Sequence, residues 1–434
     1  MARALAHIEK IHNIRPIAGA DRIELVHALG WQLIAKKGEF SEGDLAVYIE
    51  IDSKVPENDS RYEFLAQKHY KIKTMKMRGA LSQGIALPLS MFPEIKNPKV
   101  GMDVTELLRI KKIETEEELR LAREEKYDKN KAFRVRLQRV SQQHKKFAKS
   151  KFGTWMLKHK LTRKIVVQLL GGKVEKPKSF PSWIKKTDEE RIQNLPHYCE
   201  LTDTFIATEK VDGTSTTFAV KAKNKRCKKY EFIVCSRNVR QVDMNQETYF
   251  GDGIDNVYWE MAFKYNIEKI LTTIAREMRA ATVVLQGETV GEGLQGNRYD
   301  YKGRKFFGYN FIVNGEKWDT IKAADYLADY GITWVPILDR NFHMLPTVDD
   351  MLAYAEGYSV ITDDDKHSRE GIVFRGLNNP ELSFKAVSNS FLLEKHPDLL
   401  ARDMAIKKEE EIRGHIMSKE EKKEFYKQQG LIVQ

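Results

Sequence analysis

The chain has 434 residues, 41% of them hydrophobic, which is enough for more than one buried core. Lys and Arg total 73 against 62 Asp and Glu, so the net charge is +11 and polyanions should bind in a salt-sensitive way. No apolar run approaches the roughly 20 residues of a bilayer span, and the N-terminus alternates like a strand instead of forming a signal-peptide core. These features argue against a membrane partner and predict an intracellular protein of two or three domains, which we expect to be a monomer.

The cysteine content excludes two kinds of small stabilised domain. The cysteines are Cys199, Cys227 and Cys235, an odd set without a Cys-x-x-Cys pair. Such a set argues against a disulfide framework and against a structural zinc site.

Residues 1–108 show short segments of alternating polarity separated by turn residues such as Pro16, Gly30 and Gly43. This pattern predicts a small all-β domain of about five strands, an oligonucleotide-binding (OB) type barrel whose open face typically binds single strands. Within it, Lys68–Arg78 interleaves basic with apolar or aromatic residues, as expected of one strand. A nucleic-acid contact and a merely solvated face explain that strand equally well.

Residues 109–178 differ in kind. Ile113–Lys126 reads as an exposed helix of mixed charge, Arg134–Lys151 is basic without an acidic residue, and Trp155–Leu170 has helical apolar spacing that stops at Gly171. The segment is either an insertion that grips RNA or a helical linker with a solvated basic face. We slightly favour the linker, because charge runs on helices are usually solvated.

Residues 179–400 form the third candidate domain, followed by a charged helical tail over 401–434. Thr187 with Glu190 makes a capping box that predicts a helix through Leu195. Strands then dominate, and we expect two antiparallel sheets with helices over 254–266 and 267–280 packed outside. The fold class is therefore α+β.

Lys210 stands in the most informative stretch, Thr208–Ser215, which reads Thr-Glu-Lys-Val-Asp-Gly-Thr-Ser. Asp212-Gly213 predicts a tight hairpin turn, because Gly tolerates positive φ there. A lysine beside such a turn is ordinary surface structure on its own. The order of the motifs downstream favours a nucleophile instead: Val234–Asn238, Gly287–Thr289, Phe306–Asn310, Glu370–Phe374 and Ser383–Lys385.

This succession resembles the covalent nucleotidyltransferases, and among them the ATP-dependent RNA ligases. It is most similar to the Deinococcus-type branch, which carries an OB domain ahead of the catalytic domain. Three more segments support that likeness: Pro16–Leu25, Lys186–Asn194 and Gly293–Tyr299. The resemblance fails between about 112 and 178.

The resemblance implies a role for each matching residue. Lys210 would carry AMP, Arg237 would contact phosphate, and Lys385 would hold the α-phosphate and depress the pKa of Lys210. Glu288 and Glu370 would bind Mg²⁺ or Mn²⁺. ATP would be held further by Glu209, Val211, Ser215, Tyr309 and Val373, with Tyr309 and Val373 on either side of adenine. Relatives often have a second lysine where this chain has Val387, and an Asp where it has Asn310, so a two-lysine phosphate clamp is not implied.

The chemistry agrees with these roles. A lysine amine attacks phosphorus only when neutral, yet its ordinary pKa is about 10.4, so its surroundings must remove the proton. The implied function is ATP-dependent joining of RNA 3′-hydroxyl and 5′-phosphate ends, in RNA or RNA-containing duplexes, through lysyl-AMP and RNA-adenylate. The alternatives are a DNA ligase or mRNA capping guanylyltransferase, which place the OB domain after the last motif, or a non-catalytic RNA-binding protein.

Overall fold

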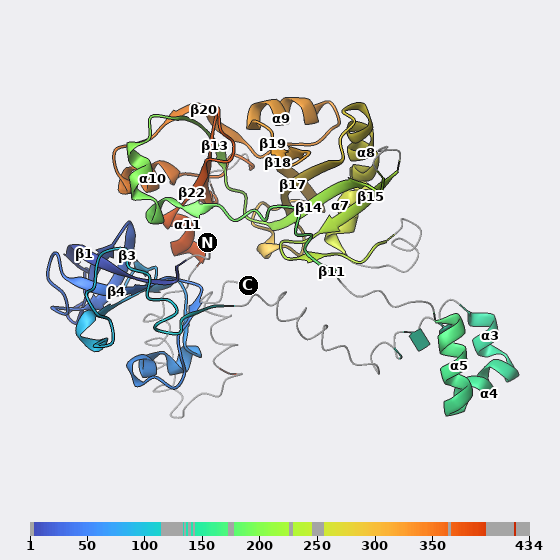
Figure 1. Ribbon diagram of the computed structural model, residues 1–434, viewed down its shortest axis with the longest axis horizontal. Helices are drawn as coiled ribbons and strands as arrows, with labels where there is room; N and C mark the ends of the chain where they lie inside the picture. Colours follow the sequence, from blue (N-terminus) through green and yellow to red (C-terminus); the bar gives the residue numbers. More distant parts are fainter. Residues whose placement is uncertain are drawn as a thin grey trace. The chain divides into compact units, whose positions relative to one another are not determined.

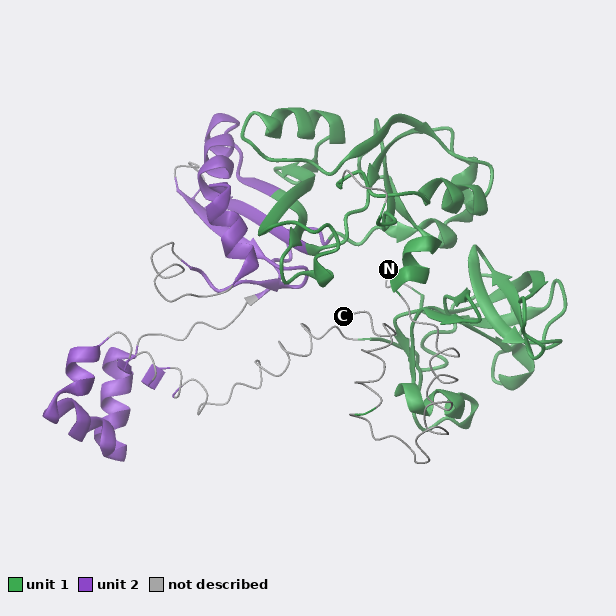
Figure 2. Ribbon diagram, turned by 180° about the vertical axis from the view of Figure 1, so that it is seen from behind, with its two compact units in different colours: residues 1–113, 187–214, 285–434 green, residues 114–186, 215–284 purple. Residues whose placement is uncertain are grey.

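The computed structural model describes residues 4–113, 133, 136–137, 140–141, 144–171, 178–224, 229–244, 256–362, 366–395 and 421. The chain divides into two compact units, coloured separately in Figure 2. Unit 1 comprises residues 1–113, 187–214 and 285–434, and unit 2 comprises residues 114–186 and 215–284. Among the described residues, no helix is long and apolar enough to cross a membrane.

The N-terminal sheet of unit 1 has five strands in the order β3-β2-β1-β4-β9. Their bounds are β1 Ala6–Pro16, β2 Ile23–Ala28, β3 Trp31–Lys36, β4 Leu45–Ile49 and β9 Ile85–Pro88. The long strand β1 pairs with β2 through its C-terminal half and with β4 through its N-terminal half, and its register shifts between His12 and Arg15. Apolar clusters lie against the sheet, one around Ile8 and Val47 and one around Val26 and Trp31. This confirms the OB-like sheet expected from the alternating pattern.

Shorter elements complete this domain: β5 Ser53–Lys54, η1 Ser60–Lys68, β6 Lys71–Ile72, β7 Met75–Met77, β8 Ala80–Ser82, η2 Leu89–Met91 and β10 Lys111–Lys112. The single strand expected over Lys68–Arg78 is wrong. His69 and Tyr70 adopt left-handed backbone conformations after η1, so two separate short strands follow. Strand β10 pairs with β5, so the pairing of this domain extends past residue 108.

The described part of the basic segment includes helices α3 Lys145–Lys149, α4 Lys151–Lys158 and α5 Lys160–Leu170. The single helix expected over Trp155–Leu170 is wrong, because His159 has an extended backbone (φ −87°, ψ 132°) and separates α4 from α5. The helix end expected at Gly171 is confirmed, because Leu170 is the last residue of α5 and Gly171 caps it. The helix expected over Ile113–Lys126 falls almost entirely outside the described residues.

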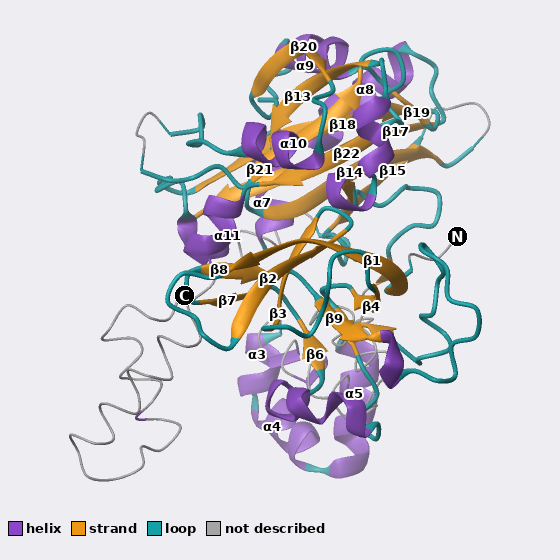
Figure 3. Cartoon of the chain, turned by 90° about the vertical axis from the view of Figure 1, so that its left-hand side faces the viewer, coloured by secondary structure: helices purple, strands orange, loops and turns teal. Residues whose placement is uncertain are grey.

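A five-stranded sheet in unit 1 has the order β12-β22-β21-β13-β20. The strands are β12 Glu190–Arg191, β13 Thr204–Glu209, β20 Ile337–His343, β21 Gly371–Gly376 and β22 Ser383–Val387. All pairs are antiparallel except β12 with β22, which is parallel. Helix α10, Val348–Ala355, contributes Met351, Leu352 and Ala355 to the apolar core of this sheet. Strands β13, β20, β21 and β22 and helix α10 are labelled in Figure 3.

The helix expected from Thr187 to Leu195 is wrong. Glu190 and Arg191 pair with β22, and only a short 3₁₀ turn, η3 Ile192–Asn194, follows them. Pairing with a neighbouring strand overrides the local capping signal, as tertiary context commonly does.

The remaining elements include further strands and outer helices, labelled in Figure 1. In unit 2, β11, β16, β15 and β14 are neighbours in that order. In unit 1, β17, β18 and β19 follow one another. Helices α7 and α8 agree with those expected over 254–266 and 267–280. The bounds are β11 Lys178–Ser179, η4 Pro196–Glu200, β14 Thr214–Ala222, β15 Tyr230–Cys235, β16 Val239–Arg240, α7 Val257–Lys264, α8 Ile267–Glu277, β17 Thr282–Gly291, η5 Gln295–Asn297, β18 Arg304–Val313, β19 Glu316–Lys317, α9 Thr320–Ala328 and α11 Asn389–Lys395.

Candidate active site

The five-stranded sheet has one apolar face and one polar face, and Lys210 belongs to the polar side. Strand register decides this, because residues paired across strands point to the same face and successive residues alternate. The apolar face carries residues of the buried core: Phe205, Ala207, Ile372, Phe374, Phe384 and Ala386. The opposite face carries Thr208, Val373 and Lys385 in one row and Ile206, Arg375 and Ser383 in the next.

Lys210 directly follows β13 and continues its alternation. Its backbone N–H donates to the carbonyl oxygen of Gly371 (2.9 Å), which extends the pairing with β21 by one residue. Lys210 therefore falls two residues along the chain from Thr208, on the side that also presents Lys385. The strand register thus places Lys210 and Lys385 on one face of the sheet, although they are not direct neighbours.

The ammonium group of Lys210 forms an ion pair with Glu370, with 2.6 Å between Nζ and Oε1. Burial lowers the pKa of Lys210, but the charges of Glu370, Glu288 and Asp212 outweigh burial and raise it above its usual value. The largest influences on the pKa of Lys210 are thus burial and these three acidic residues, and the effect expected of Lys385 stays a prediction. Lys385 lies 3.5 Å from Asp188 and helps to lower the pKa of Glu189.

Gly213 is needed for close packing and not for a hairpin. Strands β13 and β14 belong to different sheets, so the segment between them is a crossover. The φ angle of Gly213 is not positive, and a Cβ atom there would lie 2.4 Å from the carbonyl oxygen of Thr289 and 3.0 Å from Cγ of Glu288. The hairpin with a left-handed glycine is therefore wrong, and Gly213 allows the Lys210 segment to approach β17.

Asp212 is fixed on two sides. Its carboxylate forms an ion pair with Lys395 of α11 at 3.3 Å, and its backbone N–H donates to the hydroxyl oxygen of Tyr299 at 2.8 Å. Burial raises the pKa of Asp212, the charge of Glu370 raises it further, and Lys395 and Lys210 oppose this effect. Asp212, Glu370 and Lys210 are thus electrostatically coupled.

Glu288 and Glu370 differ in how the backbone presents them. Glu370 immediately precedes β21, whereas Glu288 lies within β17. Oε2 of Glu370 is buried without a hydrogen-bond partner among the described residues. That orphaned oxygen fits a divalent cation, and Mg²⁺ commonly takes one or two carboxylates and completes its shell with water and phosphate oxygens. Among the described residues, no three His, Cys, Asp or Glu side chains form a preformed metal cage.

Charged groups also gather at the Arg375 end of the polar face. Glu189 accepts a hydrogen bond from Ser383 and lies 3.8 Å from the Arg375 guanidinium. Burial raises the pKa of Glu189, but Arg375 and Lys317 outweigh burial and hold it below its usual range. The Arg375 guanidinium lies 5.8 Å from the ring centre of Tyr309, whose hydroxyl is hydrogen-bonded to Thr187 (3.0 Å).

The other residues expected to contact ATP differ in burial and in the unit to which they belong. Glu209 is buried on the apolar side, where its carboxylate accepts hydrogen bonds from the Ser359 hydroxyl (2.5 Å) and the Val360 N–H (2.9 Å). Val211 and Val373 are buried. Ser215 and Arg237 fall in unit 2, where Arg237 is exposed just after β15.

Four residues of this site were absent from the expected set: Asp212, Lys395, Arg375 and Glu189. Asp212 had a sequence signal, because it stands two residues after Lys210 in the same motif. Arg375 had a weaker one, as a charge that ends an otherwise apolar strand. Glu189 had only its place in the matching segment Lys186–Asn194, and Lys395 had none, because only tertiary packing brings it to the site.

Comparisons with known proteins agree with this geometry. An RNA ligase family model matches residues 203–387, and an OB-fold domain model matches residues 5–89. The solved structure of the Naegleria gruberi RNA ligase with PPi is 30% identical, covers 91% of this chain and 99% of its own, and has a TM-score of 0.64. The chain belongs to the RNA ligase family. Structures of mutants of the same Naegleria ligase are also similar, one with ATP and Mn (29% identity, 91% and 99% coverage, TM-score 0.63) and one with AMP and Mn (30%, 91% and 99%, 0.65). No curated protein matches the chain at a significant level.

Membership confirms the resemblance drawn from the motifs, and it makes the enzyme an RNA ligase whose OB-type domain precedes its catalytic domain. The two family matches leave residues 90–202 uncovered, so the basic segment of this RNA ligase lies outside both.

Proposed function

We propose that this RNA ligase uses ATP and a divalent metal to join a 3′-hydroxyl to a 5′-phosphate through lysyl-AMP on Lys210. One observation carries the proposal: Lys210 lies on the polar side of a sheet whose other side is the core, forms an ion pair with Glu370 and shares its face with Lys385. The similar Naegleria ligase has been solved with ATP and Mn, which supports the choice of nucleotide and metal.

In the first step, Nζ of Lys210 attacks the α-phosphorus of ATP and pyrophosphate leaves. The amine must first lose a proton, and Glu370, 2.6 Å away, is placed to accept it. A divalent cation held by Glu288 and by the other oxygen of Glu370, Oε2, would offset the negative charges that raise the pKa of Lys210 and the charge that develops on the phosphate. Lys385 would hold the α-phosphate from the same face.

The nucleoside would lie against the polar face. Val373 presents an apolar side chain there, and Tyr309 is held at its edge by Arg375 and Thr187. These two residues suit the faces of a planar adenine ring. We assign Arg237 and Ser215 to phosphate contacts, and Glu209 and Val211 to shaping the pocket from beneath the nucleophile.

AMP then passes from Lys210 to the RNA 5′-phosphate, and the 3′-hydroxyl displaces AMP as the new phosphodiester forms. We propose that the preferred ends are those of a nick in an RNA-containing duplex. The N-terminal barrel packs directly on the catalytic domain through Leu81, Val387 and Phe391, which supports one continuous binding surface for such a duplex.

The decisive experiment follows covalent transfer of label from α-³²P-ATP to the protein with Mg²⁺ or Mn²⁺, using denaturing electrophoresis. Lys210→Ala and Lys210→Arg should abolish labelling, while Lys302→Ala, a lysine outside the site, should not. A nicked duplex with an RNA 3′-hydroxyl tests sealing on the same samples.

Three results would replace the proposal. Labelling of Lys210→Ala would move the nucleophile elsewhere. Efficient labelling by GTP instead of ATP would favour capping chemistry, and sealing of all-DNA nicks without any RNA preference would favour the DNA ligase alternative.

A further inference from the structure

The positive charge of this chain is concentrated in one segment. Residues 131–173 contain 13 Lys and Arg and no Asp or Glu. The whole chain has a net charge of +11, so all other residues together sum to 11 − 13 = −2. The net positive charge of the chain therefore comes from this segment.

Helices α3, α4 and α5 display this charge to solvent. Seven of their lysines are exposed: Lys145, Lys146, Lys149, Lys151, Lys158, Lys160 and Lys164. No acidic residue of this segment neutralises them, so the surface differs from an ordinary solvated helix of mixed charge.

Aromatic rings lie among these lysines and face solvent as well. Phe152 is 64% exposed and Trp155 is 52% exposed, and their rings are stacked with 6.3 Å between centroids. His159 continues the row, 5.0 Å from Trp155. Phe152 and Trp155 are three apart and share one face of α4, and the ring contact of His159 directly after the helix extends them to a strip of three rings.

The strip is not part of the helices' own core. Gly153 lies on the other side of α4 and is buried. A Cβ atom at this position would lie 1.9 Å from the carbonyl oxygen of Phe147, so α3 and α4 are in contact there. Val166 and Val167 are the buried residues of α5. Five of the eleven exposed large hydrophobic side chains of the described residues lie in these short helices, which indicates a binding surface.

We propose that α3, α4 and α5 form a second RNA-binding surface, which holds an unpaired stretch of RNA. The lysines would neutralise phosphates, and Phe152 and Trp155 would stack on bases, the combination used by proteins that bind single strands. RNA is the polyanion of choice because the chain belongs to the RNA ligase family. Lysyl-AMP formation does not depend on this surface, so the two proposals can fail separately.

The experiment measures binding of a fluorescent, unstructured single-stranded RNA to the full-length protein by anisotropy, without ATP or divalent metal. Phe152→Ala with Trp155→Ala should weaken binding by about tenfold or more while leaving the salt dependence unchanged. Lys149→Gln, Lys151→Gln, Lys158→Gln and Lys160→Gln together should reduce the slope of log affinity against log salt by about 1 to 3. Both variants should form lysyl-AMP at the wild-type rate.

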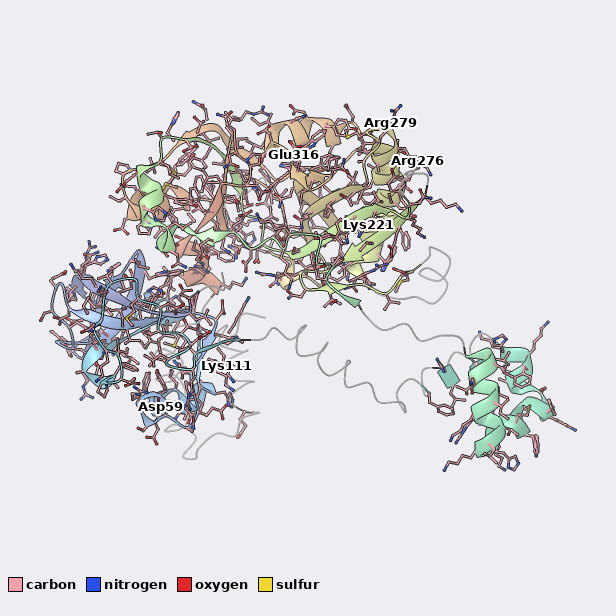
Figure 4. The ribbon with its side chains drawn as sticks, viewed as in Figure 1. Asp59, Lys111, Lys221, Arg276, Arg279 and Glu316 are labelled. Atoms are coloured by element: carbon pink, nitrogen blue, oxygen red, sulfur yellow. The ribbon has the colours of Figure 1, made fainter. Side chains whose placement is uncertain are left out.

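Matched controls separate this surface from general charge and apolar exposure. Arg276→Gln with Arg279→Gln removes two charges at the end of α8 (Figure 4), and Phe64→Ala removes an aromatic ring that is 59% exposed. Both controls should leave RNA affinity within about twofold.

Three outcomes would overturn the proposal. Equal losses in the control variants would reduce the effect to net charge. Unchanged RNA affinity in both the aromatic and the lysine variants of α3, α4 and α5 would show that the surface does not bind RNA. Loss of binding to phosphatidylserine vesicles in these variants, with RNA binding intact, would assign the surface to a membrane.

Discussion

The indole Nε1 of Trp31 donates a hydrogen bond of 2.5 Å to Oδ1 of Asn194, which joins the N-terminal barrel to the segment beside Lys385. The Arg191 guanidinium lies 5.3 Å from the Trp31 ring centre, and Arg191 pairs in register with Lys385. The N–H of Gly30 also donates to the carbonyl oxygen of Gln193. The barrel thus supports β12, the parallel neighbour of the strand that carries Lys385.

Asn194→Ala is expected to slow lysyl-AMP formation although Asn194 is not expected to contact ATP. Loss of the hydrogen bonds to Trp31 and to Glu50 frees β12, so Lys385 is held less firmly. We expect a fall of about fivefold to tenfold in rate, corresponding to roughly 1 kcal/mol for a lost hydrogen bond. Single-turnover adenylation measures it, with the exposed Asn58→Ala as control. A rate equal to wild type would show that β12 holds its place unaided.

Leu81→Ala is expected to reduce the free energy of unfolding by about 2 to 4 kcal/mol. Leu81 is 3% exposed and packs with Val387, Phe391 and Leu392 across the contact between barrel and catalytic domain. Leu107→Ala, at a side chain that is 50% exposed, should change little. Urea unfolding of both variants provides the comparison, and similar midpoints for the two would argue against a shared core.

Removal of residues 1–178 should therefore reduce the stability of the remaining protein as well as its RNA binding. The truncated protein would expose Val387, Phe391 and Leu392, and it would lose the partners of Asn194. We expect it to form lysyl-AMP if it folds, but with a lower melting temperature and a tendency to associate. Sealing of nicks should fall further than adenylation. Equal melting temperatures for the full and truncated proteins would contradict the role given to this contact.

Glu370→Gln should lower the pKa of Lys210. The carboxylate of Glu370 is the main influence that raises this pKa, and removing its charge leaves burial, which favours the neutral amine. Competitive acetylation at varied pH, read by mass spectrometry without ATP or metal, should place the reactivity midpoint of Lys210 at lower pH in the variant. Glu63→Gln, an exposed site on η1, should leave the midpoint in place, and an upward shift in Glu370→Gln would refute the coupling.

His7 makes the stability of the barrel depend on pH. Burial lowers its pKa, but hydrogen bonds and charges from Glu50 and Glu9 outweigh burial and raise the pKa to about 9. A raised pKa stabilises the folded state fully below the unfolded value of about 6.5, and this stabilisation is lost as the pH rises through about 9. The difference in unfolding free energy between wild type and His7→Gln should shrink across that window by up to about 3 kcal/mol. A constant difference from pH 6 to pH 10 would show that His7 does not titrate as described.

The sequence predicted the elements whose signals are local and repeated. Alternation gave the barrel strands, and the motif order gave Lys210, Glu370 and Lys385 as parts of one domain. Errors arose where distant partners decide local structure. Pairing with β22 makes Glu190 and Arg191 a strand despite a good capping box, and packing against Thr289 explains Gly213 better than any turn. No sequence pattern could place Lys395 beside Asp212, because 183 positions separate them.

The two-faced sheet around Lys210 also limits how such an enzyme can change in evolution. Because neighbouring residues of β21 point to opposite sides, inserting or deleting one residue there would exchange the faces beyond that point. Phe374 would then meet the charged groups around Glu189, and Arg375 would enter the apolar core. Loops between these strands can vary in length, whereas within β21 only substitutions keep both the hydrophobic core and the chemistry intact.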